Sequence, residues 1–353
     1  MLCDPQSGEL VDRAEQLISS LPDVETPRFS FELILSEIEC NTPVSETVAD
    51  AMDSIIHLRQ LTRDLGNNLG FRIGISGTHP TADPHQQKFV NTESYQWVAQ
   101  QLQYYARRNI TFGLHVHVAV PDAEAAVAAT NALRRWLPPL LAISANSPFY
   151  EGYQTGLLSS RTIQFGAFPR TNVPMTFQSY AHFEKMVQDF LEMKSVLAYR
   201  GIWWKIRPHM DFGTLEFRVA DVQRSIRNLE LQVALSQALV YQAVQEFRSG
   251  KLQQDLPTEY IEDGLWKAAR FPLDTKVTDS ACGDVITMNA FVKRLGEYCA
   301  PALNHFGTEN VLSQLDIIRS QGSEAHEQIR QFESGGFQQL RRFLMDTVDY
   351  SLE

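Results

Sequence analysis

Two short segments of alternating polarity restrict the fold of this chain more than any other feature. In residues 110–120 and 214–221, apolar side chains occupy nearly every second position. Because successive side chains of a strand point to opposite faces, each segment predicts a strand with one buried face and one polar face. Both metal-ligand and anion-binding groups occur on the polar faces, which carry His115, His117, Glu216 and Arg218. A sheet face with these groups predicts a functional site.

Composition and charge exclude several classes of protein. The 353 residues are 44% hydrophobic and 21% charged, as in an ordinary globular protein, and the net charge of −11 argues against a nucleic-acid partner. The first residues lack the basic and apolar regions of a signal peptide, and the apolar run at 136–143 is too short to span a bilayer. The four cysteines are scattered without CxxC spacing. We therefore expect a cytoplasmic protein with reduced thiols and no membrane partner.

Periodicity predicts an α+β fold in a single domain, 1–353, with a mixed part at 1–224 and a helical part at 225–353. In the mixed part, helices are expected at 9–21, 46–69, 94–107, 121–144 (broken at Pro138–Pro139) and 179–196, and further strands at 29–41, 71–77 and 202–208. The helical part is expected to contain 225–249, 259–270, 287–306, 309–320, 323–333 and 336–350. Residues 145–178 lack periodicity, which in a compact protein favours a functional loop. The helical part offers a face for a homodimer.

Several polar residues are candidates for metal binding, each with a simpler alternative. His115 and His117 lie two apart in one strand, which suits two ligands of one ion, although a structural histidine pair fits equally well. Glu37 and Glu39 are expected to share a strand face, where they either bind Mg²⁺ or Mn²⁺ or remain solvated. Glu216 either holds a metal ion or forms a surface pair with the neighbouring Arg218.

Arginines and absent motifs narrow the chemistry further. Arg161 and Arg170 lie in the irregular region and either clamp an anion or are ordinary surface residues. Arg207 follows the pair Trp203-Trp204, and its side chain either packs in the protein interior or faces a binding pocket. The chain lacks the motifs G-x-x-x-x-G-K-[ST], G-x-G-x-x-G and G-x-S-x-G. The sequence therefore gives no motif support for a phosphate-loop NTPase, a dinucleotide-binding fold or a serine hydrolase.

A set of segments in order along the chain resembles the glutamate–cysteine ligase type 2 family, and within it the YbdK-type carboxylate–amine ligases. The matching segments are Asp4-Pro-Gln-Ser-Gly-Glu-Leu-Val11, Ile38-Glu39 with Thr42-Pro43, Gly77-Thr-His-Pro80, Gly113-Leu-His-Val-His-Val118, Ser144-Ala-Asn-Ser-Pro-Phe149, Trp203-Trp204 with Ile206-Arg-Pro208, and Thr214-Leu-Glu-Phe-Arg-Val219 followed by Asp221. Each motif is modest alone, whereas seven in order are specific and cover nearly the whole chain.

The resemblance implies a glutamine-synthetase-like antiparallel sheet with flanking helices, which binds ATP and Mg²⁺ or Mn²⁺. It implies that a carboxylate is activated as an acyl phosphate and then attacked by an amine, with weak glutamate–cysteine ligase activity as the usual assignment. Carried over by position, Glu39, His115 and Glu216 match metal-site residues, and Arg218 matches a phosphate-contacting arginine. His117, Arg161, Arg170 and Arg207 are the candidates for contacts with nucleotide or substrate.

One departure from the family pattern lowers the expected activity. The family carries a G-x-E-E-E motif just before the segment that matches residues 1–5, and these glutamates bind metal. Because first-shell carboxylates hold the cation, we expect the chain in its present form to be poorly active. A catalytically impaired homologue is therefore one alternative to an active ligase. A second alternative is a metal-dependent amide hydrolase that uses His115, His117 and carboxylates.

Overall fold

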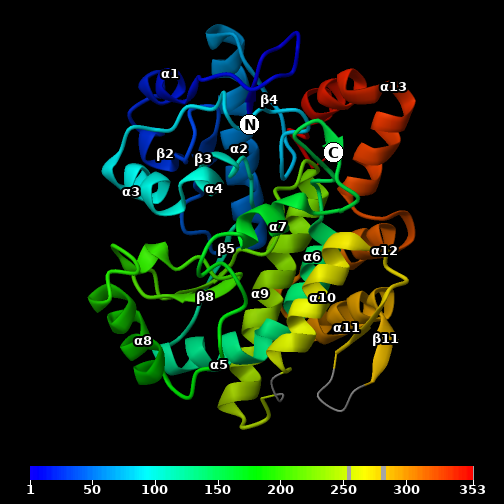
Figure 1. Ribbon diagram of the computed structural model, residues 1–353. Helices are drawn as coiled ribbons and strands as arrows, with labels where there is room; N and C mark the ends of the chain where they lie inside the picture. The colour runs from blue at the N-terminus through cyan, green and yellow to red at the C-terminus, as the bar shows by residue number, and fades with distance from the viewer. Residues whose placement is uncertain (253–255, 280–283, 353) are drawn as a thin grey trace.

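The computed structural model describes residues 1–252, 256–279 and 284–352, and Cys282 lies outside these ranges. Its central feature is an antiparallel sheet in the order β5–β9–β8, formed by Val116–Ala119, Thr214–Phe217 and Ile206–His209. The apolar face of this sheet packs on the main hydrophobic core together with α5 (Ala123–Leu133) and α9 (Ile226–Arg248). Figure 1 shows α9 running through the centre of the molecule beside β5 and β8.

The alternating pattern of the sequence explains why this sheet has two different faces. Ile206, Leu215, Phe217 and Val116 all belong to the main core. The residues between them must point to the opposite face, because side chains alternate along a strand. The polar residues predicted from the sequence therefore share one face, which lies away from α5 and α9.

The N-terminal part of the chain covers the region beside this polar face with small sheets and one long helix. Its elements are β1 (Leu2–Cys3), α1 (Ala14–Ser19), η1 (Thr26–Arg28), β2 (Phe29–Phe31), β3 (Ile38–Cys40), α2 (Val48–Leu69), β4 (Arg72–Ile73), α3 (Glu93–Leu102) and α4 (Tyr104–Arg107). β1 pairs with β4 and β2 with β3, both antiparallel. A capping box of Thr47 and Asp50 starts α2, and Gly70 ends it with a left-handed φ of 74°.

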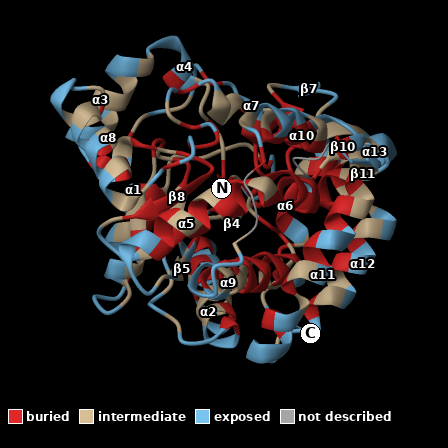
Figure 2. Ribbon diagram, turned by 90° about the horizontal axis from the view of Figure 1, so that it is seen from below, coloured by how far each residue is buried: buried red, intermediate tan, exposed pale blue. Residues whose placement is uncertain are grey.

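The remaining elements complete a mostly helical molecule. They are η2 (Arg134–Trp136), α6 (Leu137–Ser144), β6 (Phe149–Tyr150), β7 (Tyr153–Gln154), α7 (Ser160–Gly166), α8 (Tyr180–Glu192), η3 (Tyr199–Gly201), α10 (Thr258–Arg270), β10 (Lys276–Thr278), β11 (Val285–Thr287), α11 (Met288–Phe306), α12 (Val311–Gln321) and α13 (Glu324–Asp346). Figure 2 shows that buried residues concentrate in α5, α6, α9 and β8. Within the described ranges, no helix is both long enough and apolar enough to cross a membrane.

The structure confirms the α+β fold with an antiparallel sheet and corrects several boundaries. Residues 29–41 form the β2–β3 hairpin rather than one strand, so Glu37 lies outside the strand that contains Glu39. The expected strands at 71–77 and 110–120 shrink to two and four residues, and the expected helix at 9–21 shrinks to α1. The C-terminal third also contains the β10–β11 hairpin, which helical periodicity did not predict.

Candidate functional site

A row of three polar side chains crosses the sheet at Glu216. In the strand register, Glu216 of β9 lies opposite His117 of β5 on one side and Arg207 of β8 on the other. The Nε of Arg207 donates to Oε2 of Glu216, and Nε2 of His117 lies 3.6 Å from Oε1. The Nδ1 of His117 lies 2.9 Å from the hydroxyl of Thr214. Glu216, only 1% exposed, is therefore the centre of this row.

The next row along the same face contains His115, Arg218 and Lys205. Val116 and Ile206 both pair with Phe217, so the residue before each of them lies beside Arg218. The backbone N–H of Arg218 donates to the carbonyl oxygen of Lys205 at 2.8 Å. The Nη1 of Arg218 donates to Oε1 of Glu216 at 2.7 Å and lies 3.4 Å from Nδ1 of His115. The two rows are thus joined through Arg218.

The charge states of this face follow from burial and from the arginines. Burial opposes ionisation of Glu216, but the positive charges of Arg218 and Arg207 hold its pKa well below its usual value. Burial and the charge of Arg218 hold the pKa of His115 well below its usual value, and burial also lowers the pKa of His117. Glu216 is therefore an anion at neutral pH, while both imidazoles are neutral and able to act as metal ligands.

A second group of carboxyls lies in the β2–β3 hairpin. Burial raises the pKa of Glu32 to about 7, and Glu39 adds to this rise. Burial, together with the nearby charge of Glu32, raises the pKa of Glu37 well above its usual value. Burial also raises the pKa of Glu39, where Arg218 opposes the rise and Glu216 increases it. Glu39 therefore experiences the charges of the sheet residues as well as those of its own hairpin.

The residues at this face have the chemistry of a divalent cation site. Oxygen ligands suit Mg²⁺ and Mn²⁺, and a cation would offset the repulsion among carboxyls that raise one another's pKa. His115 and Glu216 lie 4.0 Å apart between Nδ1 and Oε1. In the part of the chain that the structure describes, however, no three His, Cys, Asp or Glu side chains are grouped closely enough to hold an ion. Glu216 is instead bound by two arginines.

Arg161 occupies a fixed position at the far end of the same face, at the start of α7. Its guanidinium donates to the carbonyl oxygens of Val219 and Arg218 and lies 3.8 Å from Oδ1 of Asp221. Asp221 is fully buried and accepts hydrogen bonds from Ser147, Ser159 and the backbone of Asn146. Because its guanidinium is already bound by the protein, Arg161 is suited to holding the strand beside Arg218 in place.

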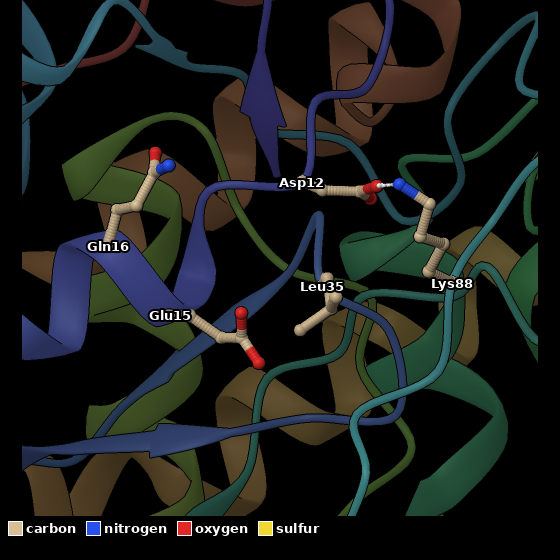
Figure 3. A pocket seen from close by; sticks show the side chains of 5 residues that line it. All are labelled: Asp12, Glu15, Gln16, Leu35 and Lys88. Atoms are coloured by element: carbon tan, nitrogen blue, oxygen red, sulfur yellow. Dashed lines mark ion pairs between the residues drawn. The ribbon is translucent and has the colours of Figure 1, made fainter.

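Two further observations lie away from the sheet rows. Arg170 has a left-handed φ of 61° and is half-buried, and its backbone carbonyl accepts from Trp203. Within the described ranges, it makes no hydrogen bond or ion pair with the other candidate residues. A hollow of about 220 Å³ is lined by Asp12, Glu15, Gln16, Leu35 and Lys88, and Figure 3 shows Lys88 pairing with Asp12 there. None of the candidate residues lines it.

The structure brings together five of the eight predicted site residues, in the two rows of the sheet face: Arg207, Glu216, Arg218, His115 and His117. Glu39 interacts with them electrostatically, Arg161 adjoins them and Arg170 stands apart. Sequence reasoning missed Glu32, because one continuous strand would place it on the opposite face from Glu39. It also missed Lys205, although its position two residues before Arg207 in a strand was a usable signal.

Comparison with known proteins gives consistent matches over almost the whole chain. The model of the Glutamate-cysteine ligase family 2 matches residues 4–342. A "Putative glutamate--cysteine ligase 2" of Herpetosiphon aurantiacus is 32% identical over 335 residues, which cover 95% of this chain and 87% of the relative. A similarly named protein of Rubrobacter xylanophilus is 34% identical over 349 residues, which cover 98% of this chain and 92% of that relative.

Solved structures show the same fold at low sequence identity. Glutamate–cysteine ligase from Francisella tularensis, determined in complex with AMP, superposes with a TM-score of 0.74 at 11% identity, covering 98% of this chain and 85% of that one. A bifunctional glutathione synthetase from Pasteurella multocida gives a TM-score of 0.68 at 14% identity, covering 91% of this chain and 47% of that one.

Proposed function

Because the chain belongs to the glutamate–cysteine ligase family 2, we propose that it is an ATP-dependent ligase that joins a carboxylate to an amine. The observation that carries this proposal is the buried network of Glu216 with Arg207 and Arg218 on a sheet face. Such paired guanidinium groups are suited to binding a phosphoryl group that carries negative charge. The fold is also that of a glutamate–cysteine ligase.

The proposed reaction proceeds in two steps. A carboxylate oxygen of the acid attacks the γ-phosphorus of ATP, the bond to the bridging oxygen breaks, and ADP leaves. The amine nitrogen then attacks the carbonyl carbon of the acyl phosphate, the carbon–oxygen bond to phosphate breaks, and the nitrogen loses a proton. Arg218 is proposed to stabilise the charge of the transferred phosphoryl group in both steps.

The other candidate residues take supporting roles in this proposal. By their positions in the family pattern, Glu39, His115 and Glu216 are proposed to hold Mg²⁺ or Mn²⁺, which when bound neutralises phosphate charge. They are not grouped closely enough to do so in this structure, so Glu216 would first have to leave its two arginines. Arg207 and His117, on either side of Glu216, are proposed to contact nucleotide or substrate, and Arg170 in the irregular region stays a candidate for such a contact. Arg161 was expected to do the same, but its guanidinium is bound by the protein, so it is proposed to hold the strand beside Arg218 in place. The region 145–178 is the proposed wall that keeps water from the acyl phosphate.

Glutamate and cysteine are the first substrate pair to test, because the relatives carry that name. Three further points stay predictions: a cytoplasmic location, a homodimer, and a single domain with a mixed part at 1–224 and a helical part at 225–353. The hydrolase alternative receives little support. It would need no ATP, whereas the relatives that this chain matches are named as ligases. A catalytically impaired homologue would keep the fold without ADP release.

The direct test is to measure ADP release by the purified chain with ATP and Mg²⁺ or Mn²⁺ while acid and amine are varied across amino-acid pairs. A ligase releases ADP and forms an amide only when both substrates are present. Arg218→Met should lower the rate about 100-fold or more, as expected when a group that stabilises transition-state charge is lost. The matched control is Arg63→Met, which removes a side chain that is 43% exposed on α2.

Three results would count against this assignment. Amide cleavage without ATP would favour the hydrolase, and no ADP release with any pair would favour the impaired homologue. Equal rates for Arg218→Met and wild type would remove Arg218 from the mechanism.

A further inference from the structure

Lys205 is a buried lysine that directly precedes β8 on the polar face of the sheet. Its carbonyl oxygen accepts from the backbone N–H of Arg218 at 2.8 Å, and Arg207 lies two residues further along the same face. Lys205 is only 7% exposed. Its ammonium group lies beneath α7, where Nζ is 3.4 Å from the hydroxyl oxygen of Thr162. The side chain is thus buried beside Arg161 and the proposed active site.

The surroundings of Lys205 do not compensate its charge. In the described part of the chain, no carboxylate lies within ion-pair distance of its Nζ, and the contact with Thr162 is long for a hydrogen bond. Burial and the neighbouring charge of Arg161 lower the pKa of Lys205 to about 8. Taking an ammonium group out of water is costly unless it is paired, so a chain retains such a group when something else binds it.

The nearby donors favour an anion as that missing partner. Arg218 has a buried Nε without a hydrogen-bond partner, and it directly adjoins Lys205 across the β8–β9 pair. Buried polar groups in proteins are nearly always hydrogen-bonded, so this donor is available to an acceptor that binds beside Lys205. Glu262 and Asp221 influence Lys205 electrostatically, but Asp221 is already bound by Arg161 and two serines.

We propose that Lys205 binds an oxyanion of a substrate, which is either a phosphate group of the nucleotide or a second carboxylate of the acid. This inference rests on the proposed ligase function and deepens it. If the bound group is the second carboxylate, the acid substrate is a dicarboxylic acid. Lys205 would then select substrates by charge, beside Arg218 and one row along the sheet face from Glu216.

The test compares wild type with Lys205→Met and Lys205→Gln by calorimetric titration of the full chain with four probes. ADP and inorganic phosphate represent the nucleotide. Glutamate and 4-aminobutyrate differ only in the second carboxylate. Both variants should bind either ADP and phosphate or glutamate about 10- to 100-fold more weakly, as expected when a hydrogen bond to a charged group is lost. If glutamate is the affected probe, 4-aminobutyrate should bind equally to all three proteins.

Thermal unfolding supplies a second readout that a structural role would not give. Lys205→Met should raise the midpoint of unfolding without ligand, because it replaces an uncompensated buried charge with an apolar chain of similar length. Lys185→Met is the matched control, since Lys185 lies on α8 with a side chain that is 70% exposed. It should change neither affinity nor the midpoint.

Several outcomes would overturn the proposal. They are unchanged affinity for all probes, recovery of affinity by Lys205→Gln, which keeps a donor for Thr162 without the charge, and a lower unfolding midpoint for Lys205→Met. The two proposals can fail separately. If ADP release depends on acid and amine, and Lys205→Met binds every probe as wild type does, only the proposal that Lys205 binds an oxyanion is refuted. Anion binding through Lys205 without any ADP release refutes the ligase assignment alone.

Discussion

Glu216→Gln removes the one negative charge between two buried arginines. The side chain of Glu216 is 2% exposed, and those of Arg207 and Arg218 are 5% and 10% exposed. The substitution keeps the shape of the side chain but leaves both guanidinium groups without their counter-charge. The N–H groups of the new amide would also face a guanidinium, which is itself a donor and cannot accept a hydrogen bond. Removing one partner of a buried ion pair typically costs about 3–5 kcal/mol.

The expected loss is large compared with the stability of a folded protein, which is about 5–15 kcal/mol. Equilibrium unfolding in urea measures the free energy of unfolding of wild type and variant under the same conditions. The control is Asp346→Asn, which breaks the exposed pair of Arg72 with Asp346 and should cost at most about 1 kcal/mol. Equal losses for the two variants would show that water screens the Glu216 network, and would refute its role as a buried charge centre.

Two further predictions concern the neighbourhood of this network. Gly113→Ala would place a Cβ 2.2 Å from Nη2 of Arg161, so it should displace that guanidinium and lower the midpoint of thermal unfolding. The control is Gly166→Ala, whose Cβ would have no neighbouring atom within 4 Å and should leave the midpoint unchanged. Equal midpoints for the two variants would show that Arg161 moves freely. Burial raises the folded-state pKa of Glu32 from 4.5 to about 7, so its favourable contribution is fully present below pH 4.5 and is lost as the pH rises to about 7. Urea unfolding across this range should show that loss in wild type and a smaller one in Glu32→Gln, and identical pH profiles would contradict the burial of Glu32.

Sequence periodicity predicted the elements whose pattern is local. The long helices α2, α9, α10 and α11 lie within two residues of their expected bounds, because an apolar face repeating at helical spacing marks them. A break expected between residues 333 and 336 corresponds to the kink of α13 at Gly335–Gly336. The polar faces of β5 and β9 were also predictable, since alternation places His117 and Glu216 opposite the apolar positions of their strands. The orientation of Arg207 was left open, because residues 202–208 do not alternate in the same way.

Features that depend on the chain folding back were not predictable from periodicity. The apolar residues between Phe29 and Cys40 are continuous enough to resemble one strand, and nothing local marks the reversal near Leu35 and Ser36 that brings Glu32 to the side of Glu39. The partners of Arg161 were hidden for the same reason. Asp221 lies 60 residues away in sequence, and only the tertiary structure shows that it binds this arginine.

The most direct test of the proposed chemistry follows the oxygen atoms of the acid. With ¹⁸O in the reacting carboxylate, an acyl phosphate intermediate transfers one labelled oxygen to inorganic phosphate for each amide formed, because the carbon–oxygen bond breaks in the second step. We expect mass spectrometry of the released phosphate to show this label with wild type, at a rate that falls with Arg218→Met. Amide formation with unlabelled phosphate would contradict an acyl phosphate at this sheet face.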